Sequence, residues 1–466
     1  MENQYKYLVI ALFIGLLAVS CDNYLDVQPK GVQLLTTVED YNQWLNSEDV
    51  QTSIPNELND LADNVDDADY TDPPSYDGVR IYAWQLQFSE DLKATPVFWA
   101  DFYQNIYYFN TVLAGIDDAT GGAESEKQNM KAEAYLGRAF EYLYLVNLYG
   151  KVYDVNTADQ DLAVPFVISN DLEDDVPERS TVQEIYEYII SDIEKALPNL
   201  PEDNSTNRFR GSVAAAYSVL ARTYLFMGDY EKAAENAQLA LDSGANALVD
   251  FSTLSGGSEM PDLRTRESAI YARLNKTHRF TAYCDLNFLQ SFDTLDLRLN
   301  YYYRTSGDYS FTDRGSVRYY SYAYPINRNS MVQINWGPSV AEMRLILAES
   351  AARANNLNTA IDQLDLLRSK RFMAEDYEKY DPENPIQEEV LQKVLDERTF
   401  EMAFTGMRWF DMRRLAAEGL MPTVYRYDAA GEIVETLAPD SNKYTLQIPI
   451  QIMYFNPDWP QNPIDN

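Results

Sequence analysis

The sequence predicts an all-α, mostly helical fold, in which a scaffold of helical hairpins is interrupted by long loop-rich insertions with a small amount of β structure. Three observations predict it. Residues 212–241 place apolar side chains at helical spacing on both sides of a glycine turn. Similar spacing returns at 131–149 and at 339–370. Residues 244–338, in contrast, show no sustained helical period and are rich in Tyr, Arg, Asn and Gly.

The hairpin at 212–241 is the most regular element of the chain. Large side chains recur at three and four residues on its first helix, Gly228-Asp229 breaks the period, and small residues follow at Ala233, Ala237 and Ala240. Large residues that pack over small ones let two helix backbones approach closely, which is the pattern of tetratricopeptide repeats. An ordinary antiparallel helix pair is the alternative interpretation.

The other elements follow from similar signals. Ser180-Thr181 followed by Glu184 forms a capping box, which predicts that a helix begins there, and its apolar stripe ends at Pro198. Ala360 repeats the hairpin pattern 127 residues after Ala233, which is not a multiple of the repeat length of about 34. The hairpins are therefore expected to be units separated by insertions and not a continuous array.

A last helix pair is predicted at 386–415, followed by a tail at 425–466 with one β hairpin near Gly431 and an extended, Pro-rich end. We therefore expect a single domain at 37–466. It comprises hairpin helices at about 97–243 and 339–370, the insertion at about 244–338, and a C-terminal region at about 386–466.

The charge of the chain limits what it can bind. Its 466 residues contain 37 Lys and Arg against 73 Asp and Glu, a formal net charge of -36. Such a surface repels nucleic acids and anionic membrane faces, so we expect no nucleic-acid partner. An uncharged ligand such as a glycan, or a peptide, fits this field better. A hydrophobic fraction of 46% is sufficient for a substantial core.

The first 20 residues are expected to be a signal peptide and not part of the fold. Lys6 precedes an apolar run at 8–19, and small residues lead to Cys21. Twelve residues span only about 18 Å as a helix, less than the ~30 Å of a bilayer core. This is the pattern of a bacterial lipoprotein in which Cys21 is lipidated and 21–36 form a tether; a plain secretory signal is the alternative. With Cys284 as the only other cysteine, no intramolecular disulfide is expected.

Signatures of catalysis and of metal binding are missing. The sequence has one histidine and no Cys-x-x-Cys, His-Glu-x-x-His, Gly-x-Ser-x-Gly or phosphate-binding glycine loop. We therefore expect no enzymatic activity, no cofactor and no metal, with a glycosidase as the remaining enzymatic alternative. The stretch 56–78 is interpreted as an acidic surface loop; calcium binding is its alternative, although the Asp-x-Asp-x-Asp-Gly order is absent.

The sharpest motif is the stretch 396–415. Glu397, Arg398 and Glu401 lie on one helical turn, Gly406 ends the helix, and four charged residues follow, namely Arg408, Asp411, Arg413 and Arg414. Glu and Arg three and four residues apart form ion pairs, and a planar guanidinium can hold backbone carbonyls at a helix junction. The pattern therefore favours a structural role over the alternative, a functional cation site.

Together these motifs resemble the SusD/RagB family of nutrient-binding outer-membrane lipoproteins. The resemblance covers essentially the whole chain and rests on the order of these motifs: Cys21, the helix at 131–150, Val164-Pro165, Arg179-Ser180-Thr181-Val182, 222–240, 397–414, Ile448-Pro449, Asn456-Pro457 and Gln461-Asn462-Pro463. It implies a tetratricopeptide-type scaffold with a loop-rich ligand face. It also implies a lipid-anchored protein on the outer membrane, facing the cell exterior, that delivers its ligand to a SusC-like TonB-dependent transporter.

The expected function is capture of a nutrient, with glycan as the first ligand class and peptide as the second. Aromatic rings offer large rigid faces for sugar stacking, and between Tyr301 and Tyr324 nine of 24 residues are aromatic. The predicted ligand-binding residues are Tyr82, Trp84, Tyr319, Tyr320 and Trp336. The alternative for the tyrosines at 317–324 is a strand with one face in the core.

Overall fold

The computed structural model describes residues 35–465, except 68–69, 71–72, 75–76, 245, 255–259, 277–278, 305–308, 310, 315–317 and 323–333. Helices dominate these residues and the strands form only small antiparallel sheets, so the predicted fold class is confirmed. The predicted signal peptide, Cys21 and most of the tether lie outside the described residues.

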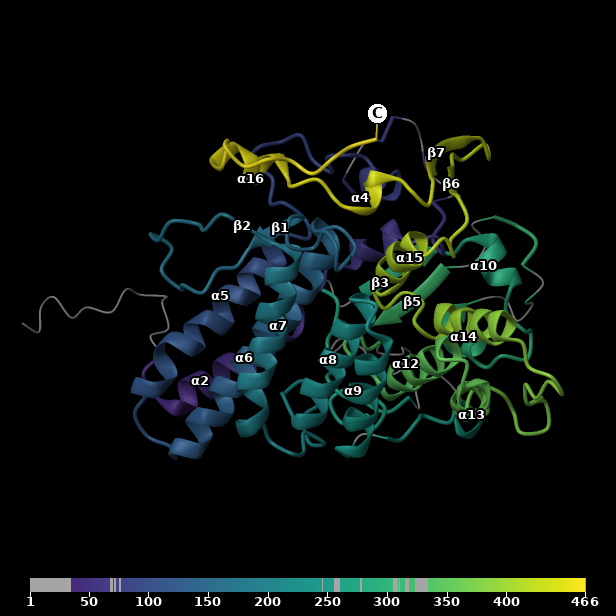
Figure 1. The fold of residues 1–466 in the computed structure, drawn as a ribbon, viewed down its shortest axis with the longest axis horizontal. Helices are drawn as coiled ribbons and strands as arrows, with labels where there is room; N and C mark the ends of the chain where they lie inside the picture. Colours follow the sequence, from purple (N-terminus) through teal and green to yellow (C-terminus); the bar gives the residue numbers. More distant parts are fainter. Residues whose placement is uncertain are drawn as a thin grey trace, which may run out of the picture.

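The helices are α2 (Val38–Leu45), α3 (Glu48–Gln51), α4 (Asp77–Tyr82), α5 (Ala100–Gly115), α6 (Glu124–Tyr149), α7 (Val182–Ala196), α8 (Val213–Phe226), α9 (Tyr230–Asp242), α10 (Leu286–Gln290), α11 (Arg298–Tyr302), α12 (Val340–Arg353), α13 (Leu357–Arg368), α14 (Gln387–Glu401), α15 (Arg408–Ala417) and α16 (Ile450–Phe455). The strands are β1 (Leu162–Pro165), β2 (Arg179–Thr181), β3 (Arg279–Tyr283), β4 (Tyr303–Arg304), β5 (Arg318–Tyr322), β6 (Val424–Tyr427) and β7 (Ile433–Leu437). In Figure 1 the long helices form the lower part of the molecule, and α4, α16 and the β6–β7 hairpin lie along its upper edge.

The hairpin predicted at 212–241 is confirmed as α8 and α9. Ser212 and Asp229 cap the two helices, because each side chain accepts a hydrogen bond at 3.1 Å from the backbone N–H three residues on. Gly228 between the helices has a φ of +74°, which glycine adopts without steric cost. Ala233 and the alanines four and seven residues after it are fully buried, and α9 packs against both α8 and α12.

The helices α6 and α7 show one confirmed prediction and one difference. Thr181 Oγ1 accepts a hydrogen bond from Glu184 N at 3.2 Å, and Glu184 Oε2 accepts one from Thr181 N at 2.8 Å, so the predicted capping box exists. The helix expected from Lys131 begins earlier, at Glu124. Its first turn is exposed and polar, so no apolar period marked it in the sequence.

The interpretation of 56–78 as an acidic surface loop is wrong for its first part. Leu58 and Leu61 in this stretch are fully buried. Asp63 receives two hydrogen bonds from Arg408, at 2.7 and 2.6 Å, and Asp66 is held by Arg314 at 2.6 Å. Arginines distant in sequence neutralise these carboxylates, so the stretch packs against the body of the protein. Residues 68–69, 71–72 and 75–76 lie outside the described set.

The insertion contains a three-stranded antiparallel sheet in the order β3-β5-β4, with Tyr303 of β4 opposite Tyr319 of β5. The strand interpretation of 317–324 is thus confirmed for the backbone of β5. The two ends of the insertion meet: Trp336 N donates to Arg273 O at 3.0 Å, and Tyr271 N donates to Pro338 O at 3.3 Å. These bonds fasten the insertion at the start of α12.

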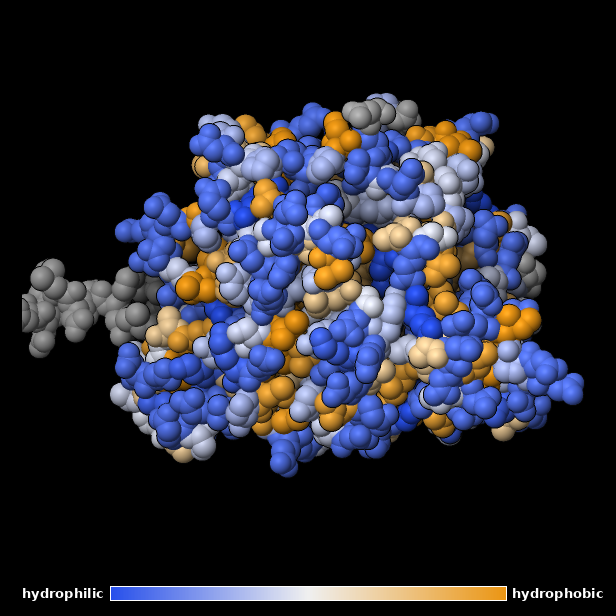
Figure 2. Space-filling model, viewed as in Figure 1, coloured by the Kyte–Doolittle hydropathy of each residue, from blue (hydrophilic) through white to orange (hydrophobic). Residues whose placement is uncertain are grey.

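The surface in Figure 2 intersperses hydrophilic and hydrophobic residues, and no continuous hydrophobic band crosses the face in view. Among the described helices, none is both long and apolar enough to cross a membrane.

The tail forms the predicted hairpin, since β6 pairs with β7 and Gly431 has a φ of +86°.

Candidate functional site

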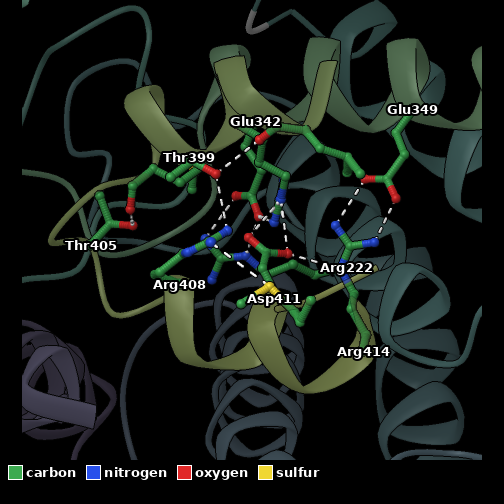
Figure 3. A network of polar contacts seen from close by, with 12 residues as sticks. Arg222, Glu342, Glu349, Thr399, Thr405, Arg408, Asp411 and Arg414 are labelled. Carbon is green, nitrogen blue, oxygen red and sulfur yellow. Dashed lines mark hydrogen bonds and ion pairs between the residues drawn. The ribbon is translucent and has the colours of Figure 1, made fainter. Parts of the chain in front are cut away.

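The motif at 396–415 forms a buried network of ion pairs between α14, α15, α12 and α8 (Figure 3). Arg398 Nε donates to both carboxylate oxygens of Asp411, at 3.0 and 2.8 Å, and Arg414 Nε donates to the same carboxylate at 2.8 Å. Arg222 on α8 donates to both oxygens of Glu342 on α12, at 2.8 and 2.7 Å, and neither side chain is exposed. The motif therefore joins helices that are far apart in the sequence.

The electrostatics of this network favour the structural role that the sequence predicts. Burial raises the pKa of Asp411, but Arg398 and Arg414 outweigh it, so the net pKa of this carboxyl is lowered. Burial likewise raises the pKa of Glu401, and Arg371 with Arg298 lowers it to about 2. These carboxylates are thus charged and already paired. In the part of the chain that is described, no group of three or more His, Cys, Asp or Glu side chains is placed to hold a metal ion.

Arg413 in the same motif holds backbone carbonyls, as predicted for a guanidinium at a helix junction. It donates to Asn147 O and, at 2.5 Å, to Gly150 O at the end of α6. Burial lowers the pKa of Arg413 to about 10, with no carboxylate among the groups that act on it. This arginine ties the C-terminal region to the end of the longest helix.

Tyr82 and Trp84, two of the predicted ligand-binding residues, lie in the core with exposed fractions of 3% each. Their ring centroids lie 4.3 and 4.1 Å from Cζ of Arg426, which is itself buried. That guanidinium donates to four carbonyl oxygens, those of Asp60, Ala62, Val65 and Tyr82. This placement gives both rings a packing role against an internal cation, and their contact with a ligand stays a prediction.

The other predicted ligand-binding residues belong to the insertion. Trp336 is 1% exposed and packs on Gly406, where a Cβ atom would lie 2.9 Å from its ring. Tyr319 and Tyr320 lie on β5, and their side chains are outside the described residues. Tyr82 and Trp84 thus pack against Arg426, Trp336 packs on Gly406, and ligand binding by the five predicted residues stays a prediction.

A cavity lies where the insertion meets the end of α14 and the start of α12. It leaves about 80 Å³ for the centres of water molecules. Its lining includes Phe251, Tyr302, Tyr303 and Phe400 together with Arg266, Asn335, Arg371 and Glu401. Since one water needs about 10–15 Å³ by this measure, about six waters fit, which is the size range of one sugar ring.

The cavity combines ring faces with fixed polar groups. Arg371 donates to both oxygens of Glu401, at 2.9 and 2.6 Å, and its Cζ lies 4.5 Å from the ring centroid of Phe251. Tyr302 is half-buried, and burial raises the pKa of its hydroxyl, which therefore stays protonated. Such a set of rings, hydroxyls and oriented ions can bind a small neutral polar molecule.

Sequence reasoning missed most of this cavity. Tyr302 and Tyr303 fall within the aromatic excess at 301–324, and Phe400 and Glu401 fall within the motif at 396–415, for which a structural role was favoured. Phe251 and Arg371 lie in segments without a motif. Only the tertiary fold brings them together.

Glu141 on α6 is a fully buried carboxyl, and its Oε2 atom has no hydrogen-bond partner among the described residues. Burial raises its pKa to about 8, and Arg273 offsets part of that effect. Asn105 Nδ2 donates to the other oxygen of Glu141, Oε1, at 3.4 Å. Burial also raises the pKa of Asp60 to about 8, and the charge of Glu57 adds to this effect.

The free energy of unfolding is therefore expected to fall as the pH rises from about 4.5 to 8. In that window the unfolded chain releases the Glu141 proton and the folded chain keeps it, so ionisation favours unfolding by about 1.4 kcal/mol for each tenfold difference in proton affinity. For Glu141→Gln, the free energy of unfolding should fall less steeply with pH than for the wild type, as measured by urea titrations at several pH values. Glu235→Gln, at an exposed position of α9, is the control. Equal slopes for both variants would contradict the assignment.

The architecture defines a class: a scaffold of helical hairpins that carries a loop-built insertion with an aromatic and polar cavity. Comparison with known proteins supplies the family. A family model described as starch-binding and associating with the outer membrane matches residues 23–225, and a model described as the SusD family matches 291–464. The chain belongs to the SusD/RagB family.

Individual relatives agree with this assignment. The chain is similar to SusD-like protein P2 of Formosa agariphila, with 26% identity over 393 residues that cover 72% of this chain and 75% of the relative. Among solved structures it is similar to a SusD superfamily protein of Bacteroides vulgatus, with a TM-score of 0.69, 19% identity and coverage of 92% and 99%. A SusD-like carbohydrate binding protein of the same species gives a TM-score of 0.68, 18% identity and coverage of 91% and 97%. At these identities the solved structures show a common fold.

Proposed function

We propose that this protein is a non-enzymatic receptor of the outer membrane that captures oligosaccharides and delivers them to a SusC-like TonB-dependent transporter. The observation that carries the proposal is the succession of the two family matches along one chain, the first of which is described as starch-binding and outer-membrane associated. One of the solved structures with the same fold is that of a SusD-like carbohydrate binding protein. The net charge of -36 also favours an uncharged ligand over an anionic one.

Anchoring through lipid at Cys21 is part of this proposal, with the protein facing the cell exterior. The apolar run at 8–19 and the small residues before Cys21 support it. Several acyl chains, each buried methylene contributing about 0.8 kcal/mol, hold a protein stably on a membrane. A receptor tethered in this way stays beside the transporter that receives its ligand.

The proposed ligand site is the cavity between the insertion and α14, together with β5 next to it. Tyr303 lines the cavity and lies opposite Tyr319 in the sheet, so the predicted ligand tyrosines of β5 belong to the same part of the insertion. In this site Tyr302 and the neighbouring rings stack on the C–H faces of a sugar, and Asn335 and the Arg371–Glu401 pair fix its hydroxyls. No bond of the ligand is broken, since the role is binding and release.

Replacing Tyr302 by alanine is expected to weaken oligosaccharide binding at least tenfold, about 1.4 kcal/mol, because it removes a ring from the cavity. Calorimetry of the purified protein against a panel of neutral oligosaccharides and oligopeptides provides the measurement. Tyr188→Ala, which removes a partly exposed ring on α7, is the matched control and should leave affinity unchanged.

Three outcomes would count against the proposal. Binding of wild-type protein to peptides alone would reject the glycan assignment, and release of reducing sugar from a polysaccharide would reject the non-enzymatic role. Unchanged affinity of a folded Tyr302→Ala variant would reject the cavity as the site.

A further inference from the structure

Two aromatic side chains at the end of α16 are unusually exposed. Tyr454 and Phe455 have exposed fractions of 64% and 77%, the largest among the aromatic side chains whose burial is described. Their ring centroids lie 5.2 Å apart and their planes are perpendicular, at 90°. The pair therefore forms a corner with ring surface open to solvent.

This corner is rigidly mounted, although it lies near the C-terminus. Before it, Ile450 N donates to Gln87 Oε1 at 3.0 Å, and Gln451 Nε2 donates to Asp91 O at 2.9 Å. After it, Trp459 is buried and its backbone N–H donates to Asn456 O at 3.1 Å. The chain is thus fixed on both sides of the two rings, so a ligand does not have to order a loose tail.

The exposed rings contribute little to folding, because each leaves most of its apolar surface in water. Hydrogen-bond acceptors stand beside them in the sequence. The amide oxygen of Asn456 and the carboxylate of Asp458 accept no hydrogen bond within the described part of the chain. Flat ring faces next to free acceptors suit a ligand with C–H surfaces and hydroxyl donors.

The local charge narrows the choice of ligand. Asp458 follows Phe455 by three residues, and the backbone of Asp91 is hydrogen-bonded to Gln451 in the same helix. The whole molecule is also strongly acidic. Anionic lipid headgroups and anionic polymers are repelled by such a surface. An uncharged, hydroxyl-rich chain meets no such repulsion and can donate to both acceptors.

We propose that Tyr454 and Phe455 form a second glycan-binding surface, separate from the cavity of the insertion. This inference rests on the proposed function and extends it. In Figure 1, α16 lies at the upper left edge of the molecule, whereas β5 lies right of centre, so the two places lie apart. When one polysaccharide contacts both places, the second contact is intramolecular, which raises overall affinity without a stronger individual site.

The test compares long and short forms of one ligand. Retardation of the purified protein in native gels that contain neutral polysaccharides, starch included, identifies a polymer that binds. Tyr454→Ala/Phe455→Ala is expected to reduce that retardation at least tenfold in apparent affinity. Its calorimetric affinity for the corresponding trisaccharide, one ring of which fits the cavity, should stay within twofold of the wild type. Tyr425→Ala/Ile433→Ala, a double change of exposed residues on the β6–β7 hairpin, is the control and should bind as the wild type.

Each outcome decides the inference. Unchanged polysaccharide retardation overturns it and leaves the proposed function intact. Equal loss of trisaccharide and polysaccharide binding overturns it too, because the two places would not be independent. Loss of a copurified transporter with unchanged glycan binding would assign the corner to a protein interface instead. If the wild-type protein binds no glycan, the proposed function itself fails.

Discussion

Replacement of Arg222 by methionine is expected to lower the free energy of unfolding by about 3–5 kcal/mol. Arg222 and Glu342 are both completely buried, and the guanidinium donates to both carboxylate oxygens. The variant leaves Glu342 in the core, where Arg398, at 3.6 Å, is the one cation that still pairs with it among the described residues. A buried carboxylate that loses its main partner retains the full desolvation penalty without the compensating attraction. Urea denaturation followed by circular dichroism measures the effect.

The matched control for Arg222 is a surface ion pair. Arg80→Met breaks the contact of Arg80 with Glu90, whose side chain is 77% exposed, and should change stability by less than about 1 kcal/mol. The double variant Arg222→Met/Glu342→Met removes the orphaned charge and should recover part of the loss. If Arg222→Met is no more harmful than Arg80→Met, the network does not stabilise the fold as described.

Alanine at Gly337 is expected to destabilise the protein by about 3 kcal/mol, at the upper end of what overpacking costs. A Cβ atom there would lie 1.9 Å from the carbonyl oxygen of Tyr271, and a backbone atom cannot rotate away. The substitution must therefore push apart the two chain segments around Tyr271 and Gly337. Hydrogen bonds hold these segments together, among them that from Trp336 N to Arg273 O. Thermal unfolding provides the measurement.

Gly228→Ala is the control for that experiment, because it introduces backbone strain without a steric contact. Gly228 has a φ of +74°, but nothing lies within 4 Å of the added Cβ. Its replacement should cost only about 1 kcal/mol. Since the Gly337 junction fastens the insertion to α12, Gly337→Ala should also weaken ligand binding in the cavity, and Gly228→Ala should not. Equal effects of both variants would show that the close approach is unimportant.

Local signals in the sequence predicted the scaffold well. The Ser212 and Asp229 caps, the turn at Gly228 and the capping box of Thr181 and Glu184 each involve residues within a few positions of one another. Short-range patterns of this kind are legible without the fold, because the partners are adjacent in the chain. The predicted start of α6 was wrong because the exposed first turn of this helix has no apolar period that could mark it.

The burial of the predicted ligand-binding residues could not be predicted from the sequence, because exposure of an aromatic residue is a tertiary property. Tyr82 and Trp84 are bound to the buried Arg426, which is more than 340 residues away in the chain. The sequence around Tyr82 does not predict a contact with that cation. Conversely, the exposed pair at Tyr454 and Phe455 lies in a tail that composition alone marks only as extended and Pro-rich.

The sequence by itself determined the helical hairpins, the class of fold, the family resemblance and the net charge of the molecule. Each of these depends on periodicity, on order along the chain or on composition. Only the tertiary structure decided which charges are paired, which rings are buried and where a cavity opens. The carboxylates of the network find guanidiniums on other helices, and the walls of the cavity come from segments far apart. Burial and pairing are properties of distant contacts, and these exist only after the chain has folded.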